Sequence, residues 1–207
     1  MDKEASGFNT KQTVAIVGLG LIGGSYARGL RRIGVGHIIA IDPDEKALQQ
    51  AKQEGMVDEI YTAGSKALKQ ADLVIFCTAA DVMIRFLAEN KAFFAPGAVL
   101  TDVAGIKGDT ATAIAALLPE GVDFVPGHPM AGREGRGYAM ASADIFNGAN
   151  YILVPMASND EDHIRGVKDM AMALGCSHVV RVTPEDHDRF IAYTSSLPHV
   201  LATALVN

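Results

Sequence analysis

The sequence predicts an α/β protein whose strands form a doubly wound, mostly parallel sheet. Short apolar runs alternate with segments of helical periodicity along most of the 207 residues. The runs are apolar at consecutive positions, which is typical of strands that are buried on both faces of a parallel sheet. Glycines follow three of the expected helices, at Gly34, Gly55 and Gly175, where helices commonly end. This alternation is the order expected of βαβ units.

The expected elements follow one another in a regular order. We expect strands at residues 14–17, 37–41, 73–78, 98–103, 122–126, 151–155 and 178–182, with a short edge strand at 59–62. Helices are expected at residues 21–33, 44–54, 80–90, 107–118 and 160–174. Residues 1–12 are polar and predict a flexible arm that precedes one domain at residues 13–183.

Residues 184–207 differ from the rest and are expected to be helical. Their first turn is acidic, which suits the positive end of a helix dipole, and Pro198 would kink or split the helix. Residues 200–206 are strongly apolar and carry no stop signal. We therefore expect a partner chain, or a continuation of the natural protein, to cover this segment.

Composition and charge exclude several classes of protein. The apolar fraction of 49% excludes a disordered chain, and the net charge of −6 gives no basic footprint for nucleic acid. No apolar run approaches the ~18 residues of a membrane span, and the polar N-terminus does not resemble a signal peptide. Cys77 and Cys176 lie far apart without metal-like spacing. We expect a cytoplasmic protein without a metal site.

A glycine-rich turn joins the first expected strand to the first expected helix. It has the pattern G-x-G-x-x-G at Gly18, Gly20 and Gly23. The first glycine permits a tight turn, the second lets the backbone approach a pyrophosphate, and the third lets the helix pack closely on the strand. The start of the helix, at Leu21 and Ile22, offers free N–H groups to phosphates. This arrangement predicts a Rossmann-type dinucleotide-binding domain.

The acidic residue that such a site requires is Asp42, which ends the second strand about 20 residues after the turn. Its carboxylate can accept hydrogen bonds from ribose hydroxyls. No Lys or Arg follows immediately, so a 2′-phosphate would meet negative charge, and we expect NAD rather than NADP. The loop after the strand at 73–78 should place Thr78 and Ala79 beside the cofactor.

His128 is the candidate catalytic base. It follows the expected strand at 122–126, so we expect it in a loop at the same carboxyl edge as the glycine turn. Glu134 is near enough in sequence to orient or charge-balance its imidazole. Histidine titrates near ~6.5 and can take the hydroxyl proton that a dehydrogenase removes as hydride leaves. A solvated loop histidine is the alternative interpretation.

Other polar residues give weaker signals. Ser195 and His199 are four residues apart and would share one face of a continuous helix, although ordinary helix polarity explains them equally well. The remaining histidines are interpreted as surface residues, namely His37, His163, His178 and His187. Asp186, His187 and Asp188 are consecutive and point three ways on a helix, so they predict no metal site.

Four segments, in chain order, resemble the prephenate dehydrogenase family. They are VAIVGLGLIGGS at 14–25, TDVAGIKG at 101–108, GHPMAGRE at 127–134 and SSLPH at 195–199. The resemblance implies NAD-dependent oxidative decarboxylation of prephenate to 4-hydroxyphenylpyruvate, on the route to tyrosine. It further implies that His128 holds the ring hydroxyl, that Glu134 belongs to the ionic network of the site, and that Ser195 and His199 lie near substrate and nicotinamide.

The chain departs from the family pattern in two respects. Gly105 stands where many members have a Ser that helps to hold the ring hydroxyl. Secondly, the family continues into an all-α domain that builds the homodimer and supplies an Arg for a substrate carboxylate, whereas residues 184–207 resemble only the truncated start of that domain. The basic candidates near the His128 segment are Lys107, Arg133 and Arg136, and none of them lies on the late helix that would close over the substrate. We therefore expect this chain alone to bind NAD with little or no turnover.

Three alternatives remain open. Arogenate could replace prephenate, since the two differ only at the side-chain keto or amino group. A β-hydroxyacid-type dehydrogenase is disfavoured, because that class resembles a different glycine loop and uses a catalytic Lys. A non-catalytic NAD-binding sensor is the alternative from another functional class.

Overall fold

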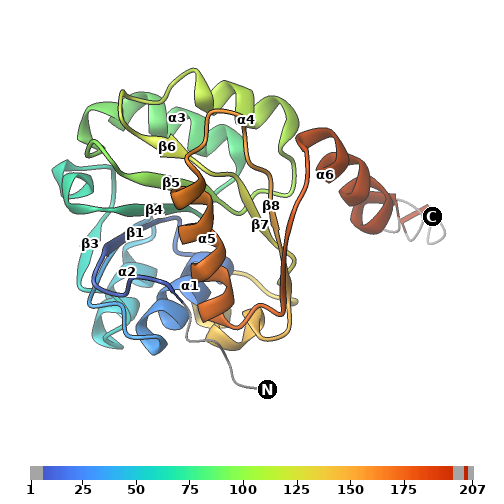
Figure 1. The fold of residues 1–207 in the computed structure, drawn as a ribbon. Helices are drawn as coiled ribbons and strands as arrows, with labels where there is room; N and C mark the ends of the chain where they lie inside the picture. The colour runs from blue at the N-terminus through green and yellow to red at the C-terminus, as the bar shows by residue number, and fades with distance from the viewer. Residues whose placement is uncertain (1–6, 198–202, 205–207) are drawn as a thin grey trace.

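The computed structural model describes residues 7–197 and 203–204. Its main sheet has six parallel strands in the order β3-β2-β1-β4-β5-β6, which confirms the predicted doubly wound α/β fold (Figure 1). The strands are β1 (Thr13–Val17), β2 (His37–Ile41), β3 (Glu59–Tyr61), β4 (Leu73–Phe76), β5 (Val99–Asp102) and β6 (Asp123–Phe124). The chain leaves one half of the sheet after β3 and starts the other half at β4, beside β1. Ligands of open α/β sheets bind where the strand order reverses in this way.

Helices cover both faces of this sheet and make two separate cores (Figure 1). Val14 and Ile16 of β1 pack into one core, whereas Ala15 and Val17 pack into the other. Because each face of the strand is buried, both sets of positions must be apolar. This packing explains why the run at 14–17 is continuous.

The helices begin and end close to the predicted residues. They are α1 (Leu21–Arg32), α2 (Glu45–Gln53), α3 (Ala80–Asn90), α4 (Gly108–Ala115) and α5 (Glu161–Leu174), with short 3-10 helices η1 (Lys66–Gln70), η2 (Lys91–Phe93), η3 (Tyr138–Met140) and η4 (Ala143–Phe146). Asp44 caps α2 by accepting from the N–H groups of Lys46 and Ala47. Helix α4 ends earlier than expected. The residue before Pro119 is disfavoured in a helix, and the turn there leads directly into β6.

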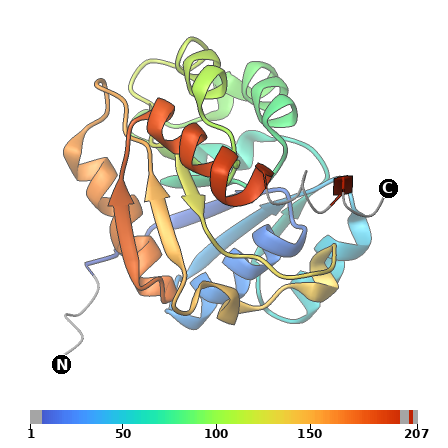
Figure 2. The ribbon, with the colours of Figure 1, turned by 90° about the vertical axis from the view of Figure 1, so that its right-hand side faces the viewer.

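The last three strands form a second sheet that the sequence analysis did not predict. Strands β7 (Gly127–Pro129), β8 (Asn150–Leu153) and β9 (His178–Arg181) pair in that order, antiparallel between β7 and β8 and parallel between β8 and β9 (Figure 2). Strand β9 lies at the edge, and Val180 is 46% exposed. The interpretation of β9 as a strand buried on both faces was therefore wrong. Likewise, His128 lies on a strand and not in a loop, because Gly127 and Pro129 pair with β8.

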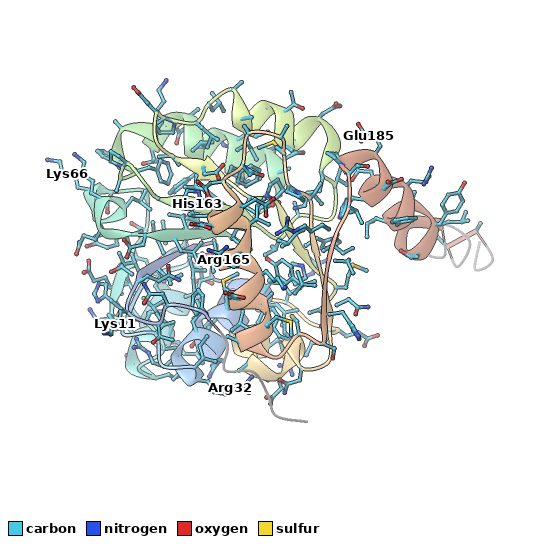
Figure 3. The ribbon with its side chains drawn as sticks, in the orientation of Figure 1. Lys11, Arg32, Lys66, His163, Arg165 and Glu185 are labelled. Carbon is cyan, nitrogen blue, oxygen red and sulfur yellow. The ribbon has the colours of Figure 1, made fainter. Side chains whose placement is uncertain are left out.

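The predicted flexible arm does not hold for its described part, residues 7–12. Phe8 is buried in the core beneath α5, and the N–H of Gly36 donates to the carbonyl of Thr10. Charged side chains such as Arg32, Lys66 and Arg165 cover the outside (Figure 3). Within the described ranges, no helix is long and apolar enough to cross a membrane, and no three His, Cys, Asp or Glu side chains gather as a metal site would require.

The chain after β9 continues as α6 (Pro184–Ile191) and a π-helical turn, η5 (Ala192–Ser196). Thr183 caps α6 by accepting from the N–H of Asp186. Helix α6 starts beside α4 and extends away from the main sheet (Figures 1 and 2). Pro198 and His199 lie outside the described residues.

Candidate active site

The glycine turn has the backbone geometry that its sequence predicts. Gly18 has φ +91°, and a Cβ at this position would lie 2.7 Å from the carbonyl oxygen of Cys77. A Cβ at Gly23 would lie 1.8 Å from the carbonyl oxygen of Gly18, so α1 packs against the turn as only glycine allows. At Gly20 nothing lies within 4 Å of a Cβ, which leaves the backbone open to a ligand.

The start of α1 is free to bind an anion. Gly20 is its N-cap, and no described side chain caps this end, so the first N–H groups, at Leu21 and Ile22, are available to phosphate. Asp42 at the end of β2 braces the turn. Its Oδ2 accepts from the N–H of Leu19 at 2.5 Å, and its Oδ1 accepts from the N–H of Asp44 at 2.8 Å.

A cavity of about 850 Å³ opens at this edge of the sheet. Gly18, Gly20, Asp42 and Thr78 line it, and Ala79 stands just outside as the N-cap of α3. The Thr78 Oγ1 atom is buried without a hydrogen-bond partner among the described residues. An unpartnered hydroxyl beside a phosphate-binding helix end fits a dinucleotide, whose oxygens would satisfy it. The far wall of the cavity was not predicted from the sequence. It is formed by Thr62, Ala63, Gly64, Val82, Arg85, Phe86, Glu89 and Asn90.

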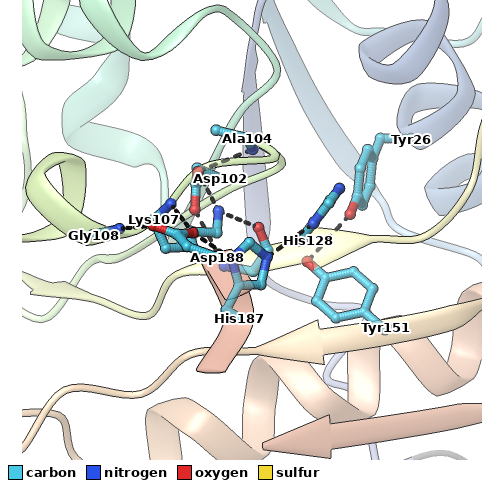
Figure 4. Close-up of polar contacts among 10 residues, drawn as sticks. Tyr26, Asp102, Ala104, Lys107, Gly108, His128, Tyr151, His187 and Asp188 are labelled. Atoms are coloured by element: carbon cyan, nitrogen blue, oxygen red, sulfur yellow. Dashed lines mark hydrogen bonds and ion pairs between the residues drawn. The ribbon is translucent and has the colours of Figure 1, made fainter. Parts of the chain in front are cut away.

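His128 lies within a line of three hydrogen-bonded side chains (Figure 4). Its Nδ1 is 3.0 Å from Nε2 of His187, and Nδ1 of His187 is 2.8 Å from Oδ1 of Asp188. The His187 side chain is fully buried. Helix α6 therefore delivers a histidine and a carboxylate to the back of the His128 ring.

Asp188 also closes the N-terminus of α4. Its two oxygens accept from the N–H groups of Lys107 and Gly108, each at 2.9 Å. Burial acts to raise the pKa of this carboxyl, but the hydrogen bonds from His187 and from the two backbone N–H groups outweigh burial and lower the pKa. Asp188 is therefore a carboxylate at neutral pH.

A buried ion pair fixes the backbone next to His128. Nζ of Lys107 lies 2.6 Å from Oδ2 of Asp102 and donates to the carbonyl of Gly127, also at 2.6 Å. Oδ1 of Asp102 accepts from the N–H of Gly127 at 3.1 Å. Burial lowers the pKa of Lys107, and the charges of Asp102 and Asp188 oppose that shift. Lys107 is thus bound inside the protein and does not reach out to a substrate.

His128 is neutral at physiological pH. Burial lowers its pKa to about 4, and the nearby Lys107 charge and His187 act in the same direction. Gly105 lies at the other side of the ring, where a Cβ would be 3.6 Å from Cε1 and 3.8 Å from Nε2 of His128. The segments 101–108 and 127–134 therefore meet at the Nε2 edge of this imidazole.

The remaining predicted catalytic residues are Glu134, Ser195 and His199. Glu134 is exposed, and within the described ranges it makes no hydrogen bond to His128. Ser195 lies in η5, and His199 lies outside the described residues. The interpretation of His187 as a surface residue was wrong. The sequence feature that could have predicted its burial is the four-residue spacing between His187 and Ile191, since both are buried on one face of α6.

The fold and this site define a nucleotide-binding domain of the Rossmann type. Residues 26–180 match the family model for the prephenate dehydrogenase nucleotide-binding domain. The chain therefore belongs to the prephenate dehydrogenase family, a family of oxidoreductases. This confirms both the family resemblance and the nucleotide-binding role predicted from the glycine turn.

Named relatives agree with this assignment. The chain is 32% identical to prephenate dehydrogenase of Bacillus subtilis, over 95% of this chain and 53% of the relative. It is 30% identical to cyclohexadienyl dehydrogenase of Zymomonas mobilis, over 93% of this chain and 66% of the relative. The chain thus spans about half the length of the Bacillus subtilis protein.

Solved structures are similar over nearly the whole chain. Prephenate dehydrogenase from A. aeolicus, in complex with hydroxyphenyl propionate and NAD+, has a TM-score of 0.88 and 30% identity, covering 99% of this chain and 70% of that one. Synechocystis arogenate dehydrogenase has a TM-score of 0.84 and 31% identity, covering 94% and 68%. A 3-hydroxyisobutyrate dehydrogenase from Salmonella typhimurium is 19% identical with a TM-score of 0.70, and shares the fold alone.

Proposed function

We propose that the natural protein is a cytoplasmic, homodimeric enzyme that oxidises prephenate with NAD and releases carbon dioxide and 4-hydroxyphenylpyruvate. The observation that carries this proposal is the neutral His128, whose Nε2 edge faces Gly105 close to the carboxyl edge of the dinucleotide-binding sheet. The A. aeolicus relative was solved with NAD+ and with hydroxyphenyl propionate, which supports the same cofactor and an aromatic product here.

The chemistry requires few protein groups. Bound NAD would accept the hydride from ring C4, while carbon dioxide leaves C1 and the electron pair of that bond completes the aromatic ring. The protein must align C4 and take the hydroxyl proton as the hydride departs. His128 Nε2 is the acceptor for that proton, and the imidazolium returns it to the phenolate oxygen once the aromatic ring has formed. Ser195, His199 and Glu134 are proposed to complete the substrate site.

Arogenate is the second candidate substrate, supported by the likeness to Synechocystis arogenate dehydrogenase. Incubating the full-length protein with NAD and each compound separates the candidates. We expect NADH and 4-hydroxyphenylpyruvate from prephenate, whereas tyrosine from arogenate alone would make arogenate the substrate. Tight NAD binding without reduction by either compound would favour the non-catalytic sensor.

Asp42 is proposed to select NAD over NADP. Its carboxylate lies at the cofactor cavity beside Pro43, so a 2′-phosphate would be repelled there. We expect NAD to bind at least about tenfold more tightly, a difference of ~1.4 kcal/mol. Asp42→Asn keeps an acceptor for the N–H of Leu19 while removing the charge. This substitution should reduce the difference between the dissociation constants of NAD and NADP. Equal or tighter binding of NADP to the unmodified protein, measured by titration, would contradict this assignment.

Gly105→Ser should be tolerated and should keep or raise turnover in the full-length enzyme. A Cβ at this position makes only ordinary contact with His128, and the added hydroxyl comes within reach of Nε2, where the ring hydroxyl of the substrate is held. Gly105→Ala fills the same space without a hydroxyl and is the matched control. A large loss of turnover in both variants with unchanged folding would show that the backbone needs glycine there.

The 207-residue chain alone should bind NAD but turn over little or no prephenate. The cofactor cavity is formed within residues 17–90, whereas Lys107 is bound to Asp102 and Arg133 donates to the carbonyl of Met140. Of the three basic candidates near the His128 segment, Arg136 is the one then left for a dicarboxylate substrate. Phe190, Tyr193 and Leu197 of the α6 and η5 region are exposed and apolar, and a second copy is proposed to cover them. Sedimentation and turnover assays test this, and full turnover by a clean monomer would contradict it.

A further inference from the structure

The line of side chains from Asp188 through His187 to His128 fixes where the protons lie. Asp188 is held as a carboxylate by the N–H groups of Lys107 and Gly108. A carboxylate only accepts hydrogen bonds, so Nδ1 of His187, 2.8 Å away, must carry a proton. A neutral imidazole has one N–H, so Nε2 of His187 is an acceptor.

The next hydrogen bond follows from the first. Nε2 of His187 lies 3.0 Å from Nδ1 of His128, so His128 donates from Nδ1. The Nε2 atom of His128 is then left with a lone pair. That atom is the one at the Gly105 side of the ring, away from His187.

We propose that His187 and Asp188 are positioning residues that hold His128 in the Nδ1–H tautomer, with Nε2 ready to accept a proton. This inference rests on the proposed function for its catalytic meaning, but the tautomer itself is a property of the resting protein. The arrangement resembles the Ser-His-Asp triad of serine proteases, in which a buried Asp fixes the tautomer of the catalytic His. Here a second imidazole lies between the acid and the base. A free imidazole without such partners has no fixed order of protons.

The same line stabilises the product of proton transfer. When Nε2 of His128 takes the hydroxyl proton, the ring becomes an imidazolium, and its Nδ1–H still donates to His187. The Asp188 carboxylate lies behind His187 and offsets the new positive charge. Among the described residues, the other charged groups near the ring are Lys107 and Asp102, which form an ion pair at 2.6 Å. Asp188 is therefore the anion left to balance an imidazolium in this cluster.

The opposite arrangement of protons along this line would give a different tautomer of His128, which can be distinguished experimentally. It would require His187 to donate from Nε2, which places the proton of His128 on Nε2 and removes the base. His187 could donate from Nε2 only as an imidazolium, or as the neutral Nε2–H tautomer, which no longer donates from Nδ1 to Asp188.

Nitrogen-15 NMR of this chain at neutral pH tests the tautomer without substrate. The His128 ring is assigned by the loss of its signals in His128→Asn. We expect Nδ1 of His128 to be protonated and Nε2 to be unprotonated. In Asp188→Asn the anion that orders the line is gone, so the Nε2–H tautomer of His128 should appear. Asp186→Asn, on the same helix and paired with Arg189 instead of His187, makes the same change of charge and should leave the His128 signals unchanged.

In the full-length enzyme, Asp188→Asn and His187→Phe should each lower kcat roughly 10²–10⁴-fold with little change in NAD affinity. An Nε2–H tautomer of His128 in the unmodified chain would overturn the proposal, whether or not the variants fold. An unchanged tautomer in a folded Asp188→Asn would overturn it as well. The predicted tautomer in a protein that oxidises neither prephenate nor arogenate would uphold the inference and reject the proposed function instead.

Discussion

His128→Asn in the full-length protein is expected to lower kcat about 10²–10⁴-fold while leaving NAD affinity within a few-fold. The substitution removes the lone pair at Nε2 that is proposed to receive the hydroxyl proton, whereas the cofactor cavity is lined by other residues. Asn can still place a donor toward His187, so the backbone of β7 should be retained. Steady-state turnover and NAD titration measure the two effects separately. Turnover within a few-fold of the unmodified enzyme would show that His128 is not the base.

The pH profile of the unmodified enzyme gives an independent check. Because burial lowers the pKa of His128 to about 4, from an ordinary value of 6.5, the ring stays unprotonated and competent well below neutral pH. The acid limb of kcat/KM should therefore fall below pH 6.5 and toward 4. For folding stability the sign is the same. The unfolded chain binds this proton first, so stability is lost as pH falls through 6.5 toward 4, and His128→Asn should lose less.

Gly23→Ala is expected to have the largest effect on the cofactor site. Its Cβ would lie 1.8 Å from the carbonyl oxygen of Gly18, and a backbone atom cannot move aside as a flexible side chain does. Helix α1 must shift away from the turn, which takes the N–H groups of Leu21 and Ile22 off the phosphate position. We expect a loss of stability of about 2–4 kcal/mol and at least a tenfold loss of NAD affinity.

Gly36→Ala is the matched control for that substitution. Gly36 has no positive φ, and nothing lies within 4 Å of a Cβ there. Thermal unfolding and NAD titration should both remain close to those of the unmodified chain. A Gly23→Ala protein with unchanged melting temperature and NAD affinity would contradict the role assigned to the close packing of α1.

The main sheet could be predicted because its physical cause is local in sequence. Strands buried on both faces must be apolar throughout, and the runs at 14–17 and 37–41 carry that signal directly. The second sheet could not be predicted in this way. The run at 151–155 has the same composition as a central strand, and nothing local says that β8 pairs with β7 and β9 instead of joining the main sheet.

In the candidate site, too, the parts that are local in sequence could be predicted and the long-range contacts could not. The glycine turn follows from one continuous strand, turn and helix, so its geometry at Gly18, Gly20 and Gly23 was predictable from their spacing. The partner of His128 was not. His187 lies 59 positions further along the chain, and the contact depends on how α6 docks beside α4. Glu134, which is near in sequence, is exposed, whereas the distant His187 touches the ring.

Ring C4 of prephenate is proposed to give up a hydride to NAD while His128 takes the hydroxyl proton. Prephenate carrying deuterium at C4 tests this claim most directly in the full-length enzyme. We predict one deuterium in each reduced cofactor for every carbon dioxide released, with none in the solvent. Deuterium in water, or carbon dioxide released without label in the cofactor, would contradict the account.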